Sequence, residues 1–118
     1  MWQRALSGSG GGGGTSVTSA VQSTPQGQAT QTISIPDSGI TEGIIVAYTY
    51  VTGGDGVEIG NITGATIEKI ANFNSSTAVT YTYDFAVYKV TNITSQTLTI
   101  TFSKYRGSPA MTQAIFIY

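Results

Sequence analysis

The sequence predicts an all-β protein: an antiparallel β-sandwich or jelly roll that follows a flexible glycine-rich N-terminal arm. Three observations predict this fold. The 118 residues include 19 Thr, a poor helix former. From about residue 30, short alternating polar and apolar stretches are separated by Gly, Pro, Asn and Asp turns. No segment carries apolar residues at helical spacing over more than two turns. We therefore expect six or seven short strands.

The chain divides near residue 30. Before it, Trp2, Arg4 and Leu6 could form one turn of an amphipathic peptide, with a frayed terminus as the alternative. Five consecutive glycines at 10–14 cost too much backbone entropy for regular structure, so we expect a tether. Residues 1–30 are thus predicted to be an anchoring peptide and tether. Residues 31–118 are predicted to form one β-sandwich, since 40% hydrophobic content supplies a single core.

The first strands of the sandwich are expected at residues 32–35 and 44–51. Residues 32–35 alternate polar and apolar side chains, and residues 36–39 supply turn chemistry. In residues 44–51 one face is apolar, which predicts that this face packs in the core. It carries Ile44, Val46, Tyr48 and Tyr50. The glycine-rich residues 53–56 predict a hairpin-type turn after this strand.

Residues 65–73 and 79–91 predict two further strands, the second being the longest extended stretch. In residues 79–91 the apolar members change face part way along, which predicts a bulge near residues 86–87. Tyr81, Tyr83, Phe85 and Val87 share one face, Thr80, Thr82, Asp84 and Ala86 share the other, and Tyr88 and Val90 are the next apolar members.

The last two strands are expected at residues 97–102 and 110–118. Residues 97–102 alternate cleanly, so Leu98, Ile100 and Phe102 are predicted to point into the core. The C-terminal stretch ends in a run of apolar and aromatic residues, 114–118.

Composition excludes several classes of function. The chain has no His and no Cys, which removes imidazole- and thiol-based nucleophile systems, thiol redox chemistry and the usual zinc sites. A net charge of −1 does not indicate the basic surface that binding to nucleic acid requires. No apolar run exceeds that of residues 44–48, and five residues are too few for membrane insertion. No secretory signal follows Leu6, so we expect synthesis in a cytoplasm.

The six carboxylates offer no catalytic or metal site that the spacing supports. A glycosidase needs two of them across a sugar, and no pair stands out. Asp84 lies mid-strand, where we expect a solvated face. The turn at residues 55–58 could give oxygens to Ca²⁺, but two carboxylates fall short of its six to eight ligands. We therefore expect no enzyme, no cofactor and no metal. The carboxylates are Asp37, Glu42, Asp55, Glu58, Glu68 and Asp84.

Aromatic residues are the remaining candidates for recognition. Tyr48, Tyr50, Tyr81 and Tyr83 are expected in the core, with a hydrated strip that stacks on sugars as the alternative. Tyr105 lies in a polar loop between Lys104 and Arg106, which favours surface recognition by these three residues.

The order of segments resembles that of small structural proteins of tailed bacteriophages. The features that carry the likeness are the Met-Trp-x-x-x-Leu start, the Gly run, the Ser/Thr/Gln spacer and the terminal β domain. Residues 84–94, followed by 97–100, are also similar to repeats of virion fibre and decoration domains. The resemblance covers the whole chain but includes no diagnostic motif, so it transfers no site residue.

The resemblance implies a capsid decoration, head-fibre or tail-fibre protein of the virion. We expect a non-enzymatic protein whose residues 1–14 dock on capsid or tail proteins and whose β-sandwich is displayed outward. Low charge and Thr-rich strands suit packing between copies, so a homo-oligomer is expected. The alternative is a carbohydrate-binding or host-adhesion module that binds a surface glycan through aromatics such as Tyr105 and Tyr88.

Overall fold

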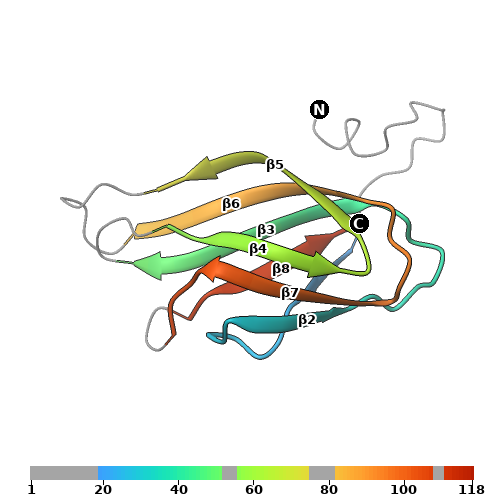
Figure 1. The fold of residues 1–118 in the computed structure, drawn as a ribbon, viewed down its shortest axis with the longest axis horizontal. Helices are drawn as coiled ribbons and strands as arrows, with labels where there is room; N and C mark the ends of the chain where they lie inside the picture. The colour runs from blue at the N-terminus through green and yellow to red at the C-terminus, as the bar shows by residue number, and fades with distance from the viewer. Residues whose placement is uncertain (1–18, 52–55, 75–81, 108–110) are drawn as a thin grey trace.

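The computed structural model describes residues 19–51, 56–74, 82–107 and 111–118, and it confirms the all-β prediction (Figure 1). Two antiparallel sheets pack face to face, and the described ranges contain no helix. The strands are β1 (Ala20–Gln22), β2 (Thr30–Ser34), β3 (Gly43–Val51), β4 (Glu58–Thr63), β5 (Thr66–Phe73), β6 (Thr82–Thr91), β7 (Thr97–Lys104) and β8 (Gln113–Ile117).

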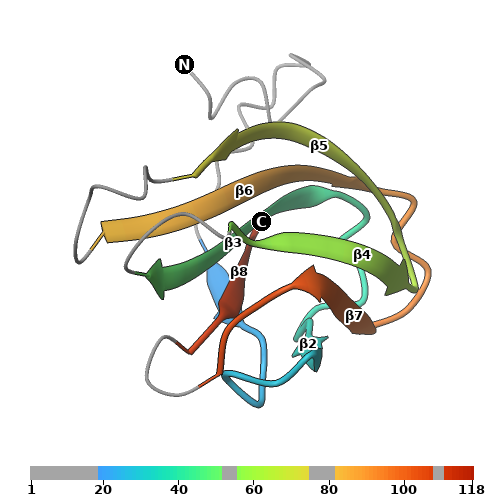
Figure 2. The ribbon, with the colours of Figure 1, turned by 60° about the vertical axis from the view of Figure 1, so that its left-hand side comes forward.

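The strands pair in the nested order of a jelly roll. The five-stranded sheet has the order β1-β8-β3-β6-β5, and the three-stranded sheet has the order β2-β7-β4. The first strand therefore pairs with the eighth, the second with the seventh and the third with the sixth. The fourth and fifth are joined by a short turn, but β5 pairs with β6 instead of β4, as Figure 2 shows.

The hydrophobic core lies between the two sheets and uses alternate residues of each strand. Leu98, Ile100 and Phe102 of β7 are buried, as the alternation predicts. Across from them, β3 and β6 contribute Ala47 and Ala86, which are directly paired. The largest fully buried apolar side chains are Phe116, Ile33, Ile45, Leu98, Ile100 and Val90.

The predicted inward face of the two central strands was wrong. Tyr48 and Tyr83 lie on the outer face of the five-stranded sheet, while Ile45 and Tyr88 point into the core. Both faces of β3 carry large apolar residues, and the apolar residues of β6 change face along the strand, so the period of two does not tell which face is buried. The predicted bulge in β6 was also wrong, because its register with β3 is continuous; the irregularity lies in β5, between Lys69 and Ala71.

The sandwich begins before the expected boundary at residue 30. Ala20–Gln22 forms the edge strand β1, and the Ser19 N–H donates to the Tyr118 carbonyl at 3.1 Å. Ser23 and Gly27, which were assigned to the tether, are buried. The sequence misses β1 because three residues are too few to show alternation. The strand β4 was not predicted either.

The expected hairpin at residues 53–56 falls largely outside the described residues. The strands that flank it belong to different sheets, so this connection crosses the sandwich and is not a hairpin. Gly56, its last residue, has a φ of +84°, which favours glycine.

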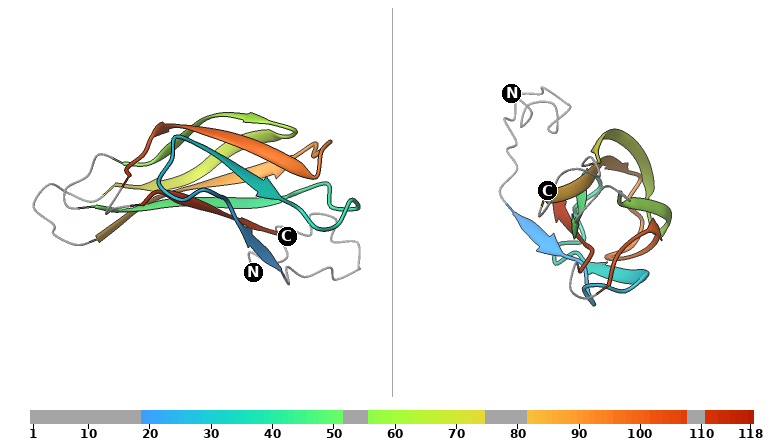
Figure 3. Two further views of the ribbon diagram at one scale, coloured as in Figure 1. Left: turned by 90° about the horizontal axis from the view of Figure 1, so that it is seen from below. Right: turned by 90° about the vertical axis from the view of Figure 1, so that its left-hand side faces the viewer.

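The two ends of the sandwich differ. The strand register places the β1–β2, β3–β4, β5–β6 and β7–β8 connections at one end, called the loop end here. Ser19 and Tyr118 lie at the opposite end, beside the β2–β3 and β6–β7 connections (Figure 3). Ser19, the first described residue, therefore lies at the end away from the four connections.

Candidate functional site

Asp84 is buried inside the sandwich and does not lie on a solvated face, so that expectation was wrong. Its carboxylate accepts a hydrogen bond from the Gly56 N–H at 2.8 Å, which ties β6 to the start of the β4 segment. Asp84 directly faces Thr49 on β3. The residue thus has a structural role at the loop end, where it secures the β3–β4 connection.

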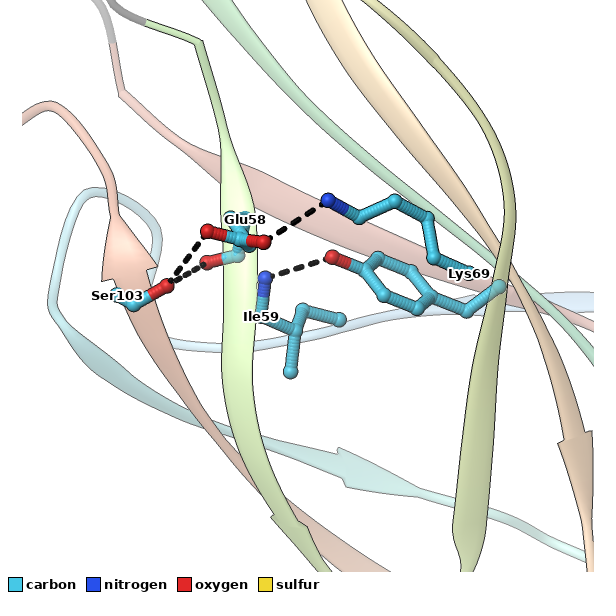
Figure 4. A network of polar contacts seen from close by, with 5 residues as sticks. Glu58, Ile59, Lys69 and Ser103 are labelled. Atoms are coloured by element: carbon cyan, nitrogen blue, oxygen red, sulfur yellow. Dashed lines mark hydrogen bonds and ion pairs between the residues drawn. The ribbon is translucent and has the colours of Figure 1, made fainter.

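Glu58 and Lys69 form an ion pair across the two sheets (Figure 4). Lys69 Nζ lies 2.9 Å from Glu58 Oε2, and the Ser103 hydroxyl lies 3.3 Å from Glu58 Oε1. The hydrogen bond from Lys69 lowers the pKa of the Glu58 carboxyl, and the same bond raises the pKa of Lys69. A carboxylate held in its charged form at the surface is a poor general acid.

Two described residues of the suggested calcium turn, Gly56 and Glu58, bond to other groups. Asp55 lies outside the described residues, Glu58 is paired with Lys69, and the Gly56 N–H is a donor toward Asp84. In the described ranges, no three acidic side chains come together at one point that could hold a metal ion. Asp37 instead accepts the Gly39 N–H at 2.8 Å, the ordinary contact of a turn-forming aspartate.

Tyr105 is exposed, as expected, and lies at the loop end. Its side chain is 46% exposed. In the sequence it comes directly after Lys104, the exposed last residue of β7. Arg106 is half-buried, and its backbone N–H donates to the Thr112 hydroxyl at 2.6 Å. In the other direction, the Thr112 N–H donates a hydrogen bond to the Arg106 carbonyl at 2.8 Å. The backbone beside Tyr105 is therefore held in place from the other side of the connection.

A buried polar network supports this loop from beneath, and sequence reasoning missed it. Gln31 Nε2 donates to the carbonyls of Gln28 and Thr112, each at 2.9 Å. The Ser23 hydroxyl donates to Gln31 Oε1 and accepts the Ala114 N–H at 2.9 Å. Gln31 and Ser23 are fully buried. Their place in a Ser/Thr/Gln-rich segment gave no signal that they are core residues.

Tyr88, the second aromatic suggested for glycan binding, is not available at the surface. Its ring is buried and its hydroxyl accepts the Ile59 N–H at 2.9 Å. Burial raises the pKa of the Tyr88 hydroxyl, and the bond from Ile59 partly offsets that rise. Tyr88 therefore connects the two sheets, and the prediction that it contacts a ligand was wrong.

Exposed aromatic side chains instead gather on the outer face of the five-stranded sheet. Tyr83 is 53% exposed, and its ring lies 5.0 Å from that of Tyr50 and 6.1 Å from that of Tyr48. Phe73 and Phe85 stack at 5.6 Å. These rings form a cluster near the loop end of β3, β5 and β6. The alternative of an exposed aromatic strip thus describes Tyr83 better than the expected core position does.

The anchoring residues Trp2, Arg4 and Leu6 lie outside the described residues, so their role stays a prediction. In the part of the chain that the structure describes, there is no helix with the length and apolar character needed to cross a bilayer. No protein-family model, curated protein or solved structure matches this chain.

Proposed function

We propose that this protein is a non-enzymatic virion structural or decoration protein, docked through residues 1–14 and displaying the sandwich on the particle surface. The observation that supports it best is the placement of the chain ends. Ser19 pairs with Tyr118 at one end of the sandwich, and the four connections lie at the other. A particle-bound arm would therefore leave the loop end pointing outward.

The chemistry of the described side chains agrees with a non-catalytic role. Asp84 is committed to a backbone N–H, Glu58 to Lys69, and Asp37 to its own turn. Paired catalytic acids in glycosidases face each other across an open site, which these three carboxylates do not do. The resemblance of the segment order to small phage proteins supplies the virion part of the proposal.

Immunogold electron microscopy tests the location. Antibodies raised against residues 19–118 are applied to particles pelleted from a culture that expresses the gene. Gold on the particles is expected. Gold absent from particles, with the protein recovered only in the particle-free supernatant, would contradict the proposal.

A rebinding assay tests the arm. Particles from a strain that lacks the gene are incubated with the full chain, with a chain lacking residues 1–14, or with Trp2→Ala/Leu6→Ala. The full chain is expected to co-sediment, and the other two are expected to lose at least tenfold in affinity. Equal co-sedimentation of all three would show that the arm is not the anchor.

The exposure of Tyr105 supports a second candidate function, which is binding of a surface glycan at the loop end. Its exposed ring stands beside the exposed Lys104, on a backbone pinned by Thr112. A preorganised loop loses little entropy on binding. Saturable binding in a glycan panel, abolished by Tyr105→Ala and unaffected by Thr99→Ala on the three-stranded sheet, would support it. No binding across the panel would reject it.

A further inference from the structure

Most side chains on the outer face of the five-stranded sheet are apolar over four successive rows, in which the polar members are Gln113, Gln22, Glu68 and Lys89, and Ile44 and Gln113 are buried. Directly paired residues share a face, so the strand register gives the members of each row. From the loop end, the rows are Tyr83 and Tyr50; then Phe73, Phe85, Tyr48 and Gln113; then Ala71, Val87, Val46, Ile115 and Gln22; then Glu68, Lys89, Ile44, Ile117 and Ala20.

This face exposes large side chains that a monomer rarely leaves in water. Tyr83, Phe73 and Phe85 are 53%, 47% and 37% exposed. Behind them, Val46, Val87 and Ile115 are partly exposed and form the middle of the face. Contiguous apolar surface of this kind marks an interaction site.

The charge on the face limits the kind of partner. Its four rows hold one acid and one base, Glu68 and Lys89, which face each other on β5 and β6. The face therefore has no net charge and offers nothing to a strongly charged partner. It is also electrostatically compatible with itself, since a second copy brings the same neutral pair.

The size of the face matches a small protein interface. Five strands about 4.8 Å apart and four rows spaced about 6.8 Å apart cover roughly 500 Å² in projection. Two such faces would bury about 1,000 Å² in total, which reaches the minimum expected of a biological interface and is less than the roughly 1,200–2,000 Å² of a standard one.

The aliphatic rows argue against a sugar as the occupant. A glycan could stack on Tyr50 and Tyr83, but Val46, Val87 and Ile115 offer it no hydrogen bonds. The Tyr48 hydroxyl already donates to Gln113 at 3.0 Å. Only a broad apolar surface covers all four rows.

We propose that the outer face of the five-stranded sheet is the interface between two copies of this chain, packed face to face about a two-fold axis. This inference does not depend on a virion role. Phe85 and Val87 of β6 lie near the centre of the interface, and Phe73, which stacks on Phe85, lies on the edge strand β5.

Sedimentation equilibrium of the full chain from 1 to 500 µM tests the proposal. A mass twice the 12.3 kDa of one copy is expected, with Phe85→Lys raising the dissociation constant at least 100-fold. Tyr83→Lys, at a more exposed position, is a second variant if Phe85→Lys does not fold. Thr99→Lys, on the outer face of the three-stranded sheet, is the matched control and is expected to leave the dimer intact.

A crosslinking experiment locates the contact directly, because the chain has no Cys of its own. Val87→Cys is expected to form a disulfide-linked dimer under mild oxidation, and Thr99→Cys is not. A monomer at all concentrations would overturn the proposal. So would a dimer that Phe85→Lys and Thr99→Lys weaken equally, or a chain that dimerises only once residues 1–18 are removed.

Discussion

The Tyr88 hydroxyl accepts a hydrogen bond from the Ile59 backbone N–H at 2.9 Å, which joins the two sheets through the core. The pairing of β4 with β7 shifts register on both sides of Ile59. Tyr88 thus satisfies a buried backbone donor at an irregular point of the three-stranded sheet. A buried donor left without a partner is costly, so this contact contributes to stability.

Replacing Tyr88 with Phe should lower the free energy of unfolding by about 1–3 kcal/mol, since the ring stays and the Ile59 N–H loses its acceptor. Urea unfolding followed by circular dichroism measures the change. Tyr105→Phe removes an exposed hydroxyl and is the control, expected to change stability by less than about 0.5 kcal/mol. Equal effects of the two variants would refute the role given to Tyr88.

Replacing Gln31 with Leu should destabilise the sandwich by about 1–3 kcal/mol, because the buried Ser23 hydroxyl loses its acceptor and the Gln28 carbonyl loses its donor. The Thr112 carbonyl loses the bond from Gln31 but keeps the one from the Gly27 N–H at 2.8 Å. Gln28→Leu, at an exposed position three residues earlier, is the matched control. A Gln31→Leu variant as stable as Gln28→Leu would show that the network is dispensable.

The ion pair between Glu58 and Lys69 should make a small pH-dependent contribution. The pKa of Glu58 is lowered, so its share is fully present above the ordinary value of 4.5 and is lost as the pH falls through the folded-state pKa. The pKa of Lys69 is raised, so its share is present below 10.5 and is lost as the pH rises through the folded-state pKa.

The expected size is below about 1 kcal/mol, because both side chains are 36% exposed to screening solvent. At pH 7, the free energy of unfolding of Lys69→Met should be lower than that of the unmodified protein. At pH 3, the two free energies should be nearly equal. Lys104→Met is the comparison: Lys104 faces Glu58 and also lowers its pKa, but less than Lys69 does, so a smaller change is expected. A difference in stability between the unmodified protein and Lys69→Met that is larger at pH 3 than at pH 7 would contradict the assignment.

Replacing Gly43 with Ala should lower stability by about 1–3 kcal/mol through overpacking. A Cβ there would lie 2.5 Å from Phe116 Cε1 and 2.6 Å from the Ile117 carbonyl oxygen. At Gly107 the nearest atom would be 3.5 Å away, so Gly107→Ala is the control. Thermal unfolding of both variants gives the comparison, and a Gly43→Ala variant with an unchanged Tm would contradict the close approach.

Part of the candidate site could be predicted from local sequence. Tyr105 stands in a polar stretch after a clear strand, and it is exposed. The position of Asp84 and Tyr88 could not be predicted, because each depends on a partner from a distant segment. Gly56 supplies the N–H for Asp84, and Ile59 supplies it for Tyr88.

The sequence by itself determined the all-β class, most strand positions and the inward face of β7, because alternation and turn residues act over a few positions. Only the tertiary structure decided which face of β3 and β6 is buried. Both faces of each strand carry some apolar residues, and the choice depends on the opposite sheet. Ala47 and Ala86 face inward together with the larger Ile45 and Tyr88, and Tyr48 and Phe85 lie outside. That selection requires contacts between strands far apart in the chain.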